Sequence, residues 1–302
     1  MAVSKYQLKK WANRYLLKRK TALQQGVGKV YSVTEIKGYY NDLTEKVING
    51  ESLLPDEIPR YYKDTGEKFV FSIGVMQYGL ACYDLYLLNG EDKHLDKMFV
   101  CADWAVENQM KNGGWKTFEH LYPENPYSSM AQGEGISLLV RAYKESSNEK
   151  YMQAAQKAVS FLLTPVEDGG VAIITETELI FKEYTQRPIV MNGWIFSLWG
   201  LLDYIKLTED KKIKEQYEKS LATLEKYISH YDLGYWTRYD YSERIAAPFY
   251  HKLHIDQFTV MYDLTGDKIF LNYKLKFEKY RDNFFYRNKA FVVKAKQKLM
   301  GK

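Results

Sequence analysis

The sequence predicts an all-α fold: an α/α toroid, an incomplete barrel of helical hairpins, with a small β-hairpin element in the loops between hairpins. Three observations support this prediction. A short signature recurs four times, the residues around each copy repeat with a helical period, and long segments rich in glycine and aromatic residues separate one repeat from the next. Self-similarity at a fixed period is typical of stacked structural repeats.

The recurring signature is an acidic residue followed by lysine, directly after a turn of small or polar residues. Its four copies are separated by 57, 61 and 57 residues, and they are Asp92-Lys93, Glu149-Lys150, Asp210-Lys211 and Asp267-Lys268. The turn ends one helix, and the helix dipole favours an acid in the first turn of the next. Hairpins that cannot bury their apolar faces alone must stack, in a toroid or an open solenoid. Short turns within hairpins and long links between them favour the toroid.

Apolar residues flank each signature with a helical period. Ile136, Leu139, Val140 and Tyr143, for example, lie at i, i+3, i+4 and i+7, on one face of a helix. We predict that the second helix of each hairpin spans 95–110, 151–163, 212–229 and 269–281 in turn. Residues 1–65 are less regular and are predicted to form an N-terminal arm with a helical extension, and 66–302 the toroidal domain.

The links between hairpins are the predicted location of the functional site. Segments 111–128, 164–190 and 230–251 each join the end of one hairpin to the start of the next, so a toroid brings them to one rim. The second link contains a predicted strand pair at 169–184. Loops held by a rigid scaffold commonly carry function.

Composition narrows the function without deciding it. The net charge is +5, from 43 Lys+Arg and 38 Asp+Glu, and no nucleic-acid-binding motif is present. A local basic cleft would suit an acidic polymer, although ordinary solvated lysines explain the total equally well. The 27 tyrosines suit a groove for sugar rings or half-buried helix surfaces.

The two cysteines and the N-terminus bear on the compartment. Cys82 and Cys101 lie within apolar helical patterns, which predicts buried thiols in a reducing environment. Residues 1–20 are basic and contain no secretory signal, and no apolar run is long enough to span a bilayer. This segment has two interpretations, a helix on the membrane surface or, preferably, an exposed helix docked on the body. We therefore expect a cytoplasmic protein, with peripheral membrane contact as an option.

Short segments in a particular order resemble the catalytic domain of the glucuronyl 5-epimerases, which convert glucuronate to iduronate in heparan-type polymers. They fall between Phe69 and Phe258 and are Gln77-Tyr78-Gly79-Leu80, Gly113-Gly114-Trp115, Ser129-Met130-Ala131-Gln132-Gly133, Glu183-Tyr184, Asn192-Gly193, Tyr239-Asp240, Tyr250-His251 and His254-Ile255. The sequence departs from the family pattern at Ser242, where an arginine is expected, and Arg244 is the predicted stand-in. The link between Tyr239 and Tyr250 is also shorter, and the β-rich region preceding the domain in animal enzymes is absent from the sequence.

The resemblance implies which residues form the site. Tyr184, Tyr239 and Tyr250 would be catalytic, with Glu183 beside the first of them. The expected substrate-binding residues are Trp115, Gln132, Asn192, Arg244, His251 and His254. Trp115 has an equally weighted alternative, in which it packs its own glycine-rich turn. The expected partner is an acidic, uronate-containing polysaccharide such as heparosan, and a homodimer is an option.

The chemistry explains why tyrosine would suit this reaction. Inverting carbon 5 of a uronate removes a proton beside a carboxylate and returns one to the opposite face, which two groups on opposite faces can do. The charge that builds on the carboxylate must be neutralised by positioned donors or cations. A tyrosine with a pKa of about 10 needs nearby cations before it can act as a base. We expect Tyr184 to oppose Tyr239 or Tyr250, while the remaining tyrosine and Arg244 or His251 polarise the carboxylate.

Two further functions compete with epimerisation. A polysaccharide lyase on the same scaffold would begin with the same proton abstraction and then expel the neighbouring sugar. A hydrolase would need two carboxylates flanking the bond, and Glu134, Glu183 and Asp240 are the candidates. A carbohydrate-binding protein without activity would keep only the fold. No metal or other cofactor is expected, because His251 and His254 have no third ligand at a suitable spacing.

Overall fold

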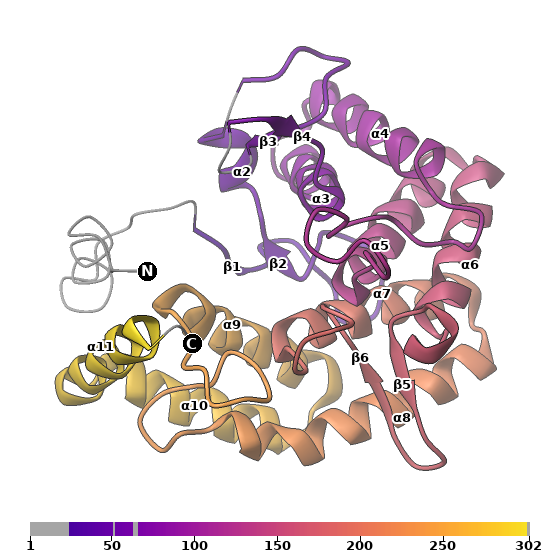
Figure 1. Cartoon of the computed structure of the whole chain (residues 1–302). Coiled ribbons are helices and arrows are strands. Elements are labelled where there is room, and N and C mark those ends of the chain that lie inside the picture. Colours follow the sequence, from indigo (N-terminus) through magenta and orange to yellow (C-terminus); the bar gives the residue numbers. More distant parts are fainter. Residues whose placement is uncertain (1–23, 51, 63–65, 301–302) are drawn as a thin grey trace. The chain divides into compact units, whose positions relative to one another are not determined.

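The computed structural model describes residues 24–50, 52–62 and 66–300, which form two compact, mainly helical units (Figure 1). The larger unit comprises residues 28–189 and 193–224. The smaller unit comprises 190–192, 225–300 and the described residues up to Val27. The predicted division into an arm, 1–65, and a domain, 66–302, stays a prediction, and the interpretations of residues 1–20 lie outside the described residues.

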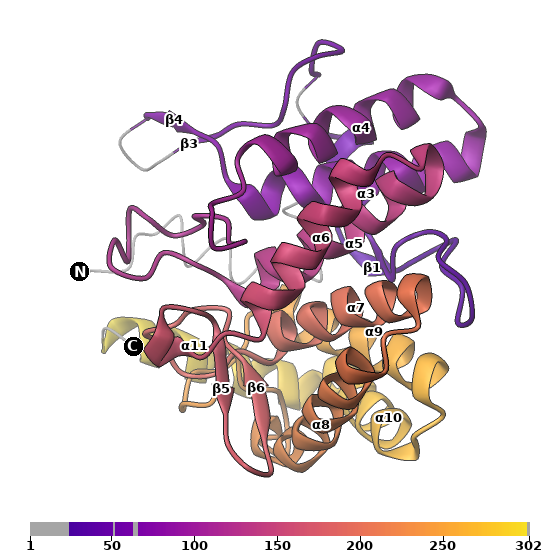
Figure 2. The ribbon, with the colours of Figure 1, turned by 90° about the vertical axis from the view of Figure 1, so that its right-hand side faces the viewer.

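Helical hairpins build the larger unit. They are α3 (Ser72–Asn89) with α4 (Asp92–Glu107), α5 (Ser129–Ser146) with α6 (Glu149–Leu162), and α7 (Met191–Thr208) with α8 (Lys211–Tyr227). The first two residues of α7 and the last three of α8 belong to the smaller unit. Within this unit α3 packs on α5, and α4 packs on α5 and α6 (Figure 2). Helices α3 and α5 are buried along most of their length, whereas α4 and α6 bury one face each.

The predicted hairpin turns are confirmed, and they share one conformation. Each first helix ends at a left-handed residue, whose positive φ lets its amide donate to a carbonyl four residues back. These residues are Gly90, Ser147, Glu209 and Gly266. The signature acid then begins the next helix, and Asp210 and Asp267 accept backbone N–H bonds there. The predicted fold class, an α/α toroid with a small β-hairpin, is confirmed at the level of the hairpins within each unit.

The remaining elements of the larger unit are short. They are β2 (Asn41–Asp42), α2 (Glu45–Ile48), β3 (Tyr61–Tyr62), β4 (Lys68–Phe69), η1 (Val166–Asp168), β5 (Ala172–Ile174) and β6 (Leu179–Phe181). Strand β3 pairs antiparallel with β4, and β5 pairs antiparallel with β6, where Ile173 lies opposite Ile180. The strand pair predicted at 169–184 is therefore confirmed.

A buried ion pair fastens residues 28–44 to the inner helices of the larger unit. Arg141 of α5 is fully buried, and its guanidinium lies 2.5 Å from the carboxylate of Asp203 in α7. It also donates to the carbonyl oxygens of Lys37 at 2.9 Å and Gly38 at 3.0 Å. The Tyr40 hydroxyl donates to Asp203 at 2.8 Å. One guanidinium thus joins two helices and the segment that crosses them.

The smaller unit contains β1 (Gly26–Val27), η2 (Ile228–Tyr231), α9 (Pro248–Thr265), α10 (Lys268–Asp282) and α11 (Phe284–Leu299). Helices α9 and α10 form its hairpin, with Phe258, Phe270 and Phe277 in the core between them. The link predicted to reach residue 251 ends earlier. Pro248 is the first residue of α9, a position that suits its fixed φ, so Tyr250 and His251 lie in the first helical turn.

The predicted thiols are confirmed as free and buried. Cys82 and Cys101 lie in α3 and α4, and burial raises the pKa of Cys101 to about 12, so it stays protonated and packs as a small apolar side chain. Across the part of the chain that the structure describes, every helix is too short or too polar to cross a lipid bilayer.

Candidate active site

Two of the predicted catalytic tyrosines lie together in the smaller unit. The ring centroids of Tyr239 and Tyr250 are 4.7 Å apart, with an angle of 63° between the rings. Tyr239 comes from the loop before α9, where its amide donates to the carbonyl oxygen of Arg244 at 2.7 Å. Tyr250 comes from the first turn of α9. Both side chains are half-buried, so each keeps an apolar contact and part of its surface for a ligand.

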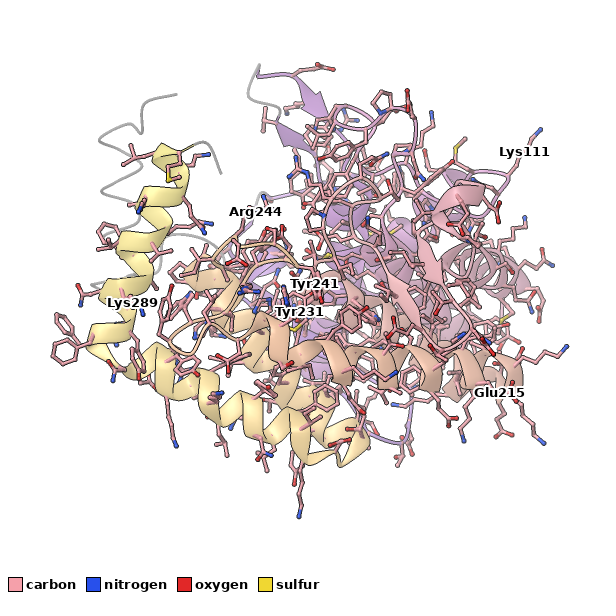
Figure 3. The ribbon with its side chains drawn as sticks, turned by 60° about the horizontal axis from the view of Figure 1, so that its bottom comes forward. Lys111, Glu215, Tyr231, Tyr241, Arg244 and Lys289 are labelled. Carbon is pink, nitrogen blue, oxygen red and sulfur yellow. The ribbon has the colours of Figure 1, made fainter. Side chains whose placement is uncertain are left out.

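A fixed cation lies beside this pair. The Arg244 guanidinium is 5.1 Å from the centroid of the Tyr239 ring, and its Nε donates to Asp240 at 2.8 Å. Asp240 is fully buried and also accepts a bond from the Ser242 amide at 3.1 Å. Figure 3 shows Arg244 in the part of the smaller unit that also holds Tyr231 and Tyr241. Positive charge close to a phenol favours its phenolate. The geometry therefore suits Arg244 as the stand-in cation.

The two histidines of α9 do not fit the role predicted for them. His251 and His254 are fully buried, and burial lowers the pKa of His251 well below its usual range and that of His254 to about 3. Both rings are therefore neutral, and neither supplies the cation that we expected of His251. The ring of His251 stacks on Trp236 with centroids 3.7 Å apart. A substrate could not reach it without displacing this packing.

Their hydrogen bonds form one chain whose proton positions can be deduced. His251 Nε2 donates to the Phe277 carbonyl oxygen at 3.1 Å, so its Nδ1 accepts from the Thr237 hydroxyl at 2.9 Å. Because that hydroxyl has one proton, His254 Nδ1 must donate to it at 3.1 Å. This row of hydrogen bonds ties the loop before α9 to α9 and α10. Among the described residues, no three His, Cys, Asp or Glu side chains gather as metal ligands.

Asn192 is a buried amide at the start of α7, within the smaller unit. Its backbone carbonyl oxygen accepts a bond from Gln257 of α9 at 3.0 Å. Its side-chain oxygen is buried and has no donor among residues 24–50, 52–62 and 66–300. A buried acceptor of this kind usually meets a ligand or water. The substrate-binding role of Asn192 stays a prediction, and this vacant acceptor supports it.

Tyr184 and Glu183 belong to the larger unit, just after β6. The Tyr184 ring stacks on Phe118, with centroids 4.4 Å apart, and the Arg187 guanidinium lies 5.3 Å from its centroid. Glu183 is buried against the start of α7, where a methyl group on Gly193 would lie 2.7 Å from its carboxylate. Tyr184 therefore has a cation beside its ring, as Tyr239 does.

Two residues predicted to bind substrate are core residues instead. Trp115 is 1% exposed, its Nε1 donates to the Ala105 carbonyl oxygen at 2.7 Å, and its ring packs against Gly135. A sugar cannot stack on it, which favours the alternative of packing. Gln132 is fully buried, and its amide bonds to the backbone of Gly113 and Trp115. It shapes the glycine-rich loop rather than a ligand site.

A buried carboxylic acid in the larger unit went without a role in the epimerase reading of the sequence. Glu134 of α5 is fully buried, and its Oε1 accepts a bond from Gln77 of α3 at 2.7 Å. Its other oxygen has no partner in the described part of the chain. Burial raises its pKa to about 8, helped by the charge of Glu183 and opposed by Gln77 and Lys46. Two features of the sequence pointed to Glu134. It is one of the candidate carboxylates, and its partner Gln77 begins one of the segments that resemble the family.

This buried acid predicts a pH dependence of stability. The folded chain holds the Glu134 proton more tightly than an exposed glutamate with a pKa near 4.5. Between these two pKa values the folded state binds more protons, so Glu134 makes the free energy of unfolding fall as pH rises. Glu134→Gln, which never ionises, should remove this loss. Its stability relative to the wild type should increase from about pH 5 to about pH 8, by up to ~1.4 kcal/mol per pH unit.

Urea unfolding at the two pH values measures this difference. Glu218→Gln is the matched control, because Glu218 is 59% exposed and should change stability equally little at both. A Glu134→Gln variant whose stability difference from the wild type is the same at both pH values would show that Glu134 ionises as an ordinary glutamate does.

Comparison with known proteins identifies the family. The family described as the D-glucuronyl C5-epimerase C-terminus matches residues 103–279, more than half of the chain. The chain belongs to this family. The matched region contains every predicted site residue from Trp115 to His254, whereas Gln77 precedes it.

The chain is also similar to two curated proteins. The chain is 32% identical over 193 residues to the D-glucuronyl C5-epimerase of Caenorhabditis elegans, covering 54% of this chain and 31% of the worm enzyme. It is 29% identical over 154 residues to an uncharacterized protein of Methanocaldococcus jannaschii, covering 49% of this chain and 50% of that protein. The chain thus spans about a third of the length of the worm enzyme and half of the length of the Methanocaldococcus protein.

Among solved structures, the chain is similar to an unsaturated glucuronyl hydrolase from Streptococcus agalactiae. The TM-score is 0.46 and the sequence identity 14%, with 68% of this chain and 56% of the hydrolase covered.

Proposed function

We propose that this chain is a uronate 5-epimerase that converts glucuronate to iduronate residues within an acidic polysaccharide such as heparosan. The observation that carries the proposal is the Tyr239–Tyr250 pair, with ring centroids 4.7 Å apart and the Arg244 guanidinium 5.1 Å from the Tyr239 ring, in a member of this family. Two phenols and a cation are the groups that proton transfer beside a carboxylate needs.

The roles follow from the chemistry. Tyr184 acts on one face of the sugar ring, and Tyr239 or Tyr250 acts on the other, one accepting the carbon 5 proton while the other donates. The remaining tyrosine and Arg244 stabilise the negative charge that develops on the carboxylate. The sequence predicted this cationic role for Arg244 or His251. Because His251 is buried and neutral, we assign the role to Arg244 alone. Asn192 contributes its vacant amide oxygen to a sugar hydroxyl.

A lyase or hydrolase is the second candidate, and one observation favours it. Burial raises the pKa of Glu134 to about 8, so this carboxyl group keeps its proton near neutral pH, as a general acid must. Asp240 is a poorer candidate than the sequence suggested, because Arg244 and Ser242 already occupy its oxygens.

Incubation with heparosan in deuterated water tests the proposal. Epimerisation predicts deuterium at carbon 5, new iduronate residues and unchanged chain length, read by nuclear magnetic resonance and size-exclusion chromatography. A catalyst raises the rate of this exchange by orders of magnitude over the uncatalysed reaction, so enzyme-free heparosan is the baseline.

Other results would replace the proposal. Shortened chains with an unsaturated terminal sugar would indicate a lyase, and shortened chains without one would indicate a hydrolase. Binding of heparosan with neither exchange nor shortening would indicate a carbohydrate-binding protein. The same assay with other uronate polymers then identifies the preferred substrate.

A further inference from the structure

Helix α11 has two chemically different sides, and one of them packs on the smaller unit. Ala290 is its only fully buried residue among those described. Tyr286 makes a ring contact with Tyr280 of α10, at a centroid distance of 5.6 Å. Lys294 donates to the Ile245 carbonyl oxygen at 2.8 Å, and the Gln297 side chain accepts from the Ile245 amide at 3.0 Å. This side fixes the helix against the loop before α9.

The opposite side of α11 is apolar and exposed. Phe285, Val292 and Leu299 are seven residues apart, so they form one stripe along a helix with 3.6 residues per turn. Their exposed fractions are 78%, 61% and 66%. Figure 3 shows side chains of α11 pointing away from the rest of the smaller unit. Single exposed apolar residues are ordinary, but three of them spaced along one face of a well-anchored helix, with lysines between them, indicate a binding surface.

Cations flank this stripe. From Phe284 to the end of the chain there is no acidic residue, and the helix itself contains Arg287, Lys289, Lys294, Lys296 and Lys298. Lys289, Lys296 and Lys298 are exposed, and Lys289 also lies over the Tyr235 ring at 4.0 Å. The side chain of a lysine beside an apolar stripe can lie along a membrane while its ammonium stays at the headgroups.

The apolar stripe and its lysines together favour one of three partners that could bind this side of α11. A second copy of this helix would bring two sets of like charges together, which disfavours self-association through the stripe. An acidic polysaccharide would match the lysines but would leave the aliphatic Val292 and Leu299 in contact with charged sugars. A membrane with anionic lipids matches both, because its headgroups attract the lysines and its acyl chains accept the stripe.

We infer that α11 docks this chain on an anionic lipid surface through Phe285, Val292 and Leu299, with Lys296 and Lys298 at the headgroups. The inference is independent of the proposed catalytic function, because it uses a different part of the smaller unit.

Vesicle co-sedimentation of the full chain tests this inference. The wild type should bind vesicles of phosphatidylcholine with one third phosphatidylglycerol and bind phosphatidylcholine alone weakly. Phe285→Ser/Val292→Ser/Leu299→Ser should lower the partition coefficient at least about tenfold. Lys296→Gln/Lys298→Gln should lower it on the order of tenfold, and salt should weaken wild-type binding.

Matched controls separate docking from loss of fold. Val33→Ser/Ile48→Ser/Leu54→Ser removes three other exposed apolar residues, which are 45%, 62% and 64% exposed, and should leave vesicle binding unchanged. All variants should keep the wild-type circular dichroism and the same exchange activity on soluble heparosan. Failure of the exchange assay would leave this inference intact, because vesicle binding is measured separately.

Three outcomes would overturn it. The first is no preference of the wild type for anionic vesicles, and the second is full binding by the stripe variant. The third is a dimer, seen by light scattering, that the stripe substitutions dissociate without any vesicle binding, which would assign the stripe to a second copy of the chain.

Discussion

Replacing Arg141 with methionine is expected to lower the free energy of unfolding by about 3–5 kcal/mol, because it leaves a buried carboxylate without its cation. Asp203 has no exposed surface in its side chain, and the pair is separated by 2.5 Å. The substitution also takes the donors from the carbonyl oxygens of Lys37 and Gly38, which an apolar side chain cannot satisfy. Urea unfolding followed by circular dichroism measures the change.

A surface lysine supplies the control for this prediction. Lys214→Met removes a cation paired with Glu218 at 3.8 Å, where the two side chains are 61% and 59% exposed, and it should cost less than about 1 kcal/mol. If Arg141→Met is as stable as Lys214→Met, the buried network does not hold residues 28–44 in place. Arg141→Lys should fall between the two, since lysine keeps the charge but cannot reach every acceptor.

Local signals made the helical hairpins predictable. The left-handed residue that ends each first helix and the acid that begins each second helix lie within a few positions of each other, so Gly90 and Asp92 alone predict one turn. Contacts between distant residues left no such signal. Nothing around Arg141 indicates that it is buried, because its partner Asp203 and its acceptor at Lys37 are remote in the sequence.

The candidate site was predictable in part, for the same reason. The order of short segments pointed to Tyr239 and Tyr250, and the structure brings their rings together. The predicted link runs into the first turn of α9, which the helix-start signal at Pro248 ruled out but its tyrosine-rich surroundings concealed. That error made His251 look like a loop cation, when a position one turn into a packed helix buries it. The sequence could not decide the role of Trp115, because a tryptophan after two glycines can equally well stack on a sugar ring or pack in the core.

Tyr239→Phe, Tyr250→Phe and Tyr184→Phe should each lower iduronate formation by about 10²–10⁴-fold while the fold is kept. The substitution removes only the hydroxyl, so the packing of the Tyr239 and Tyr250 rings, at 4.7 Å, and of Tyr184 on Phe118 should persist. The control is Tyr241→Phe. Tyr241 follows Asp240 in the same loop but is 41% exposed and stacks on His230, so its hydroxyl has no proposed role.

The three catalytic variants should then differ in how they exchange hydrogen. A variant that keeps its base but lacks the donor on the far face can remove the carbon 5 proton and return deuterium to the same face. It should label glucuronate without forming iduronate, whereas a variant without the base should do neither. Because Tyr184 is proposed to face the ring from the opposite side to one of Tyr239 and Tyr250, its variant and the variant of that tyrosine should fall into different classes. If all three behave as Tyr241→Phe does, the phenols do not transfer the proton, and the neutral acid at Glu134 becomes the group to test.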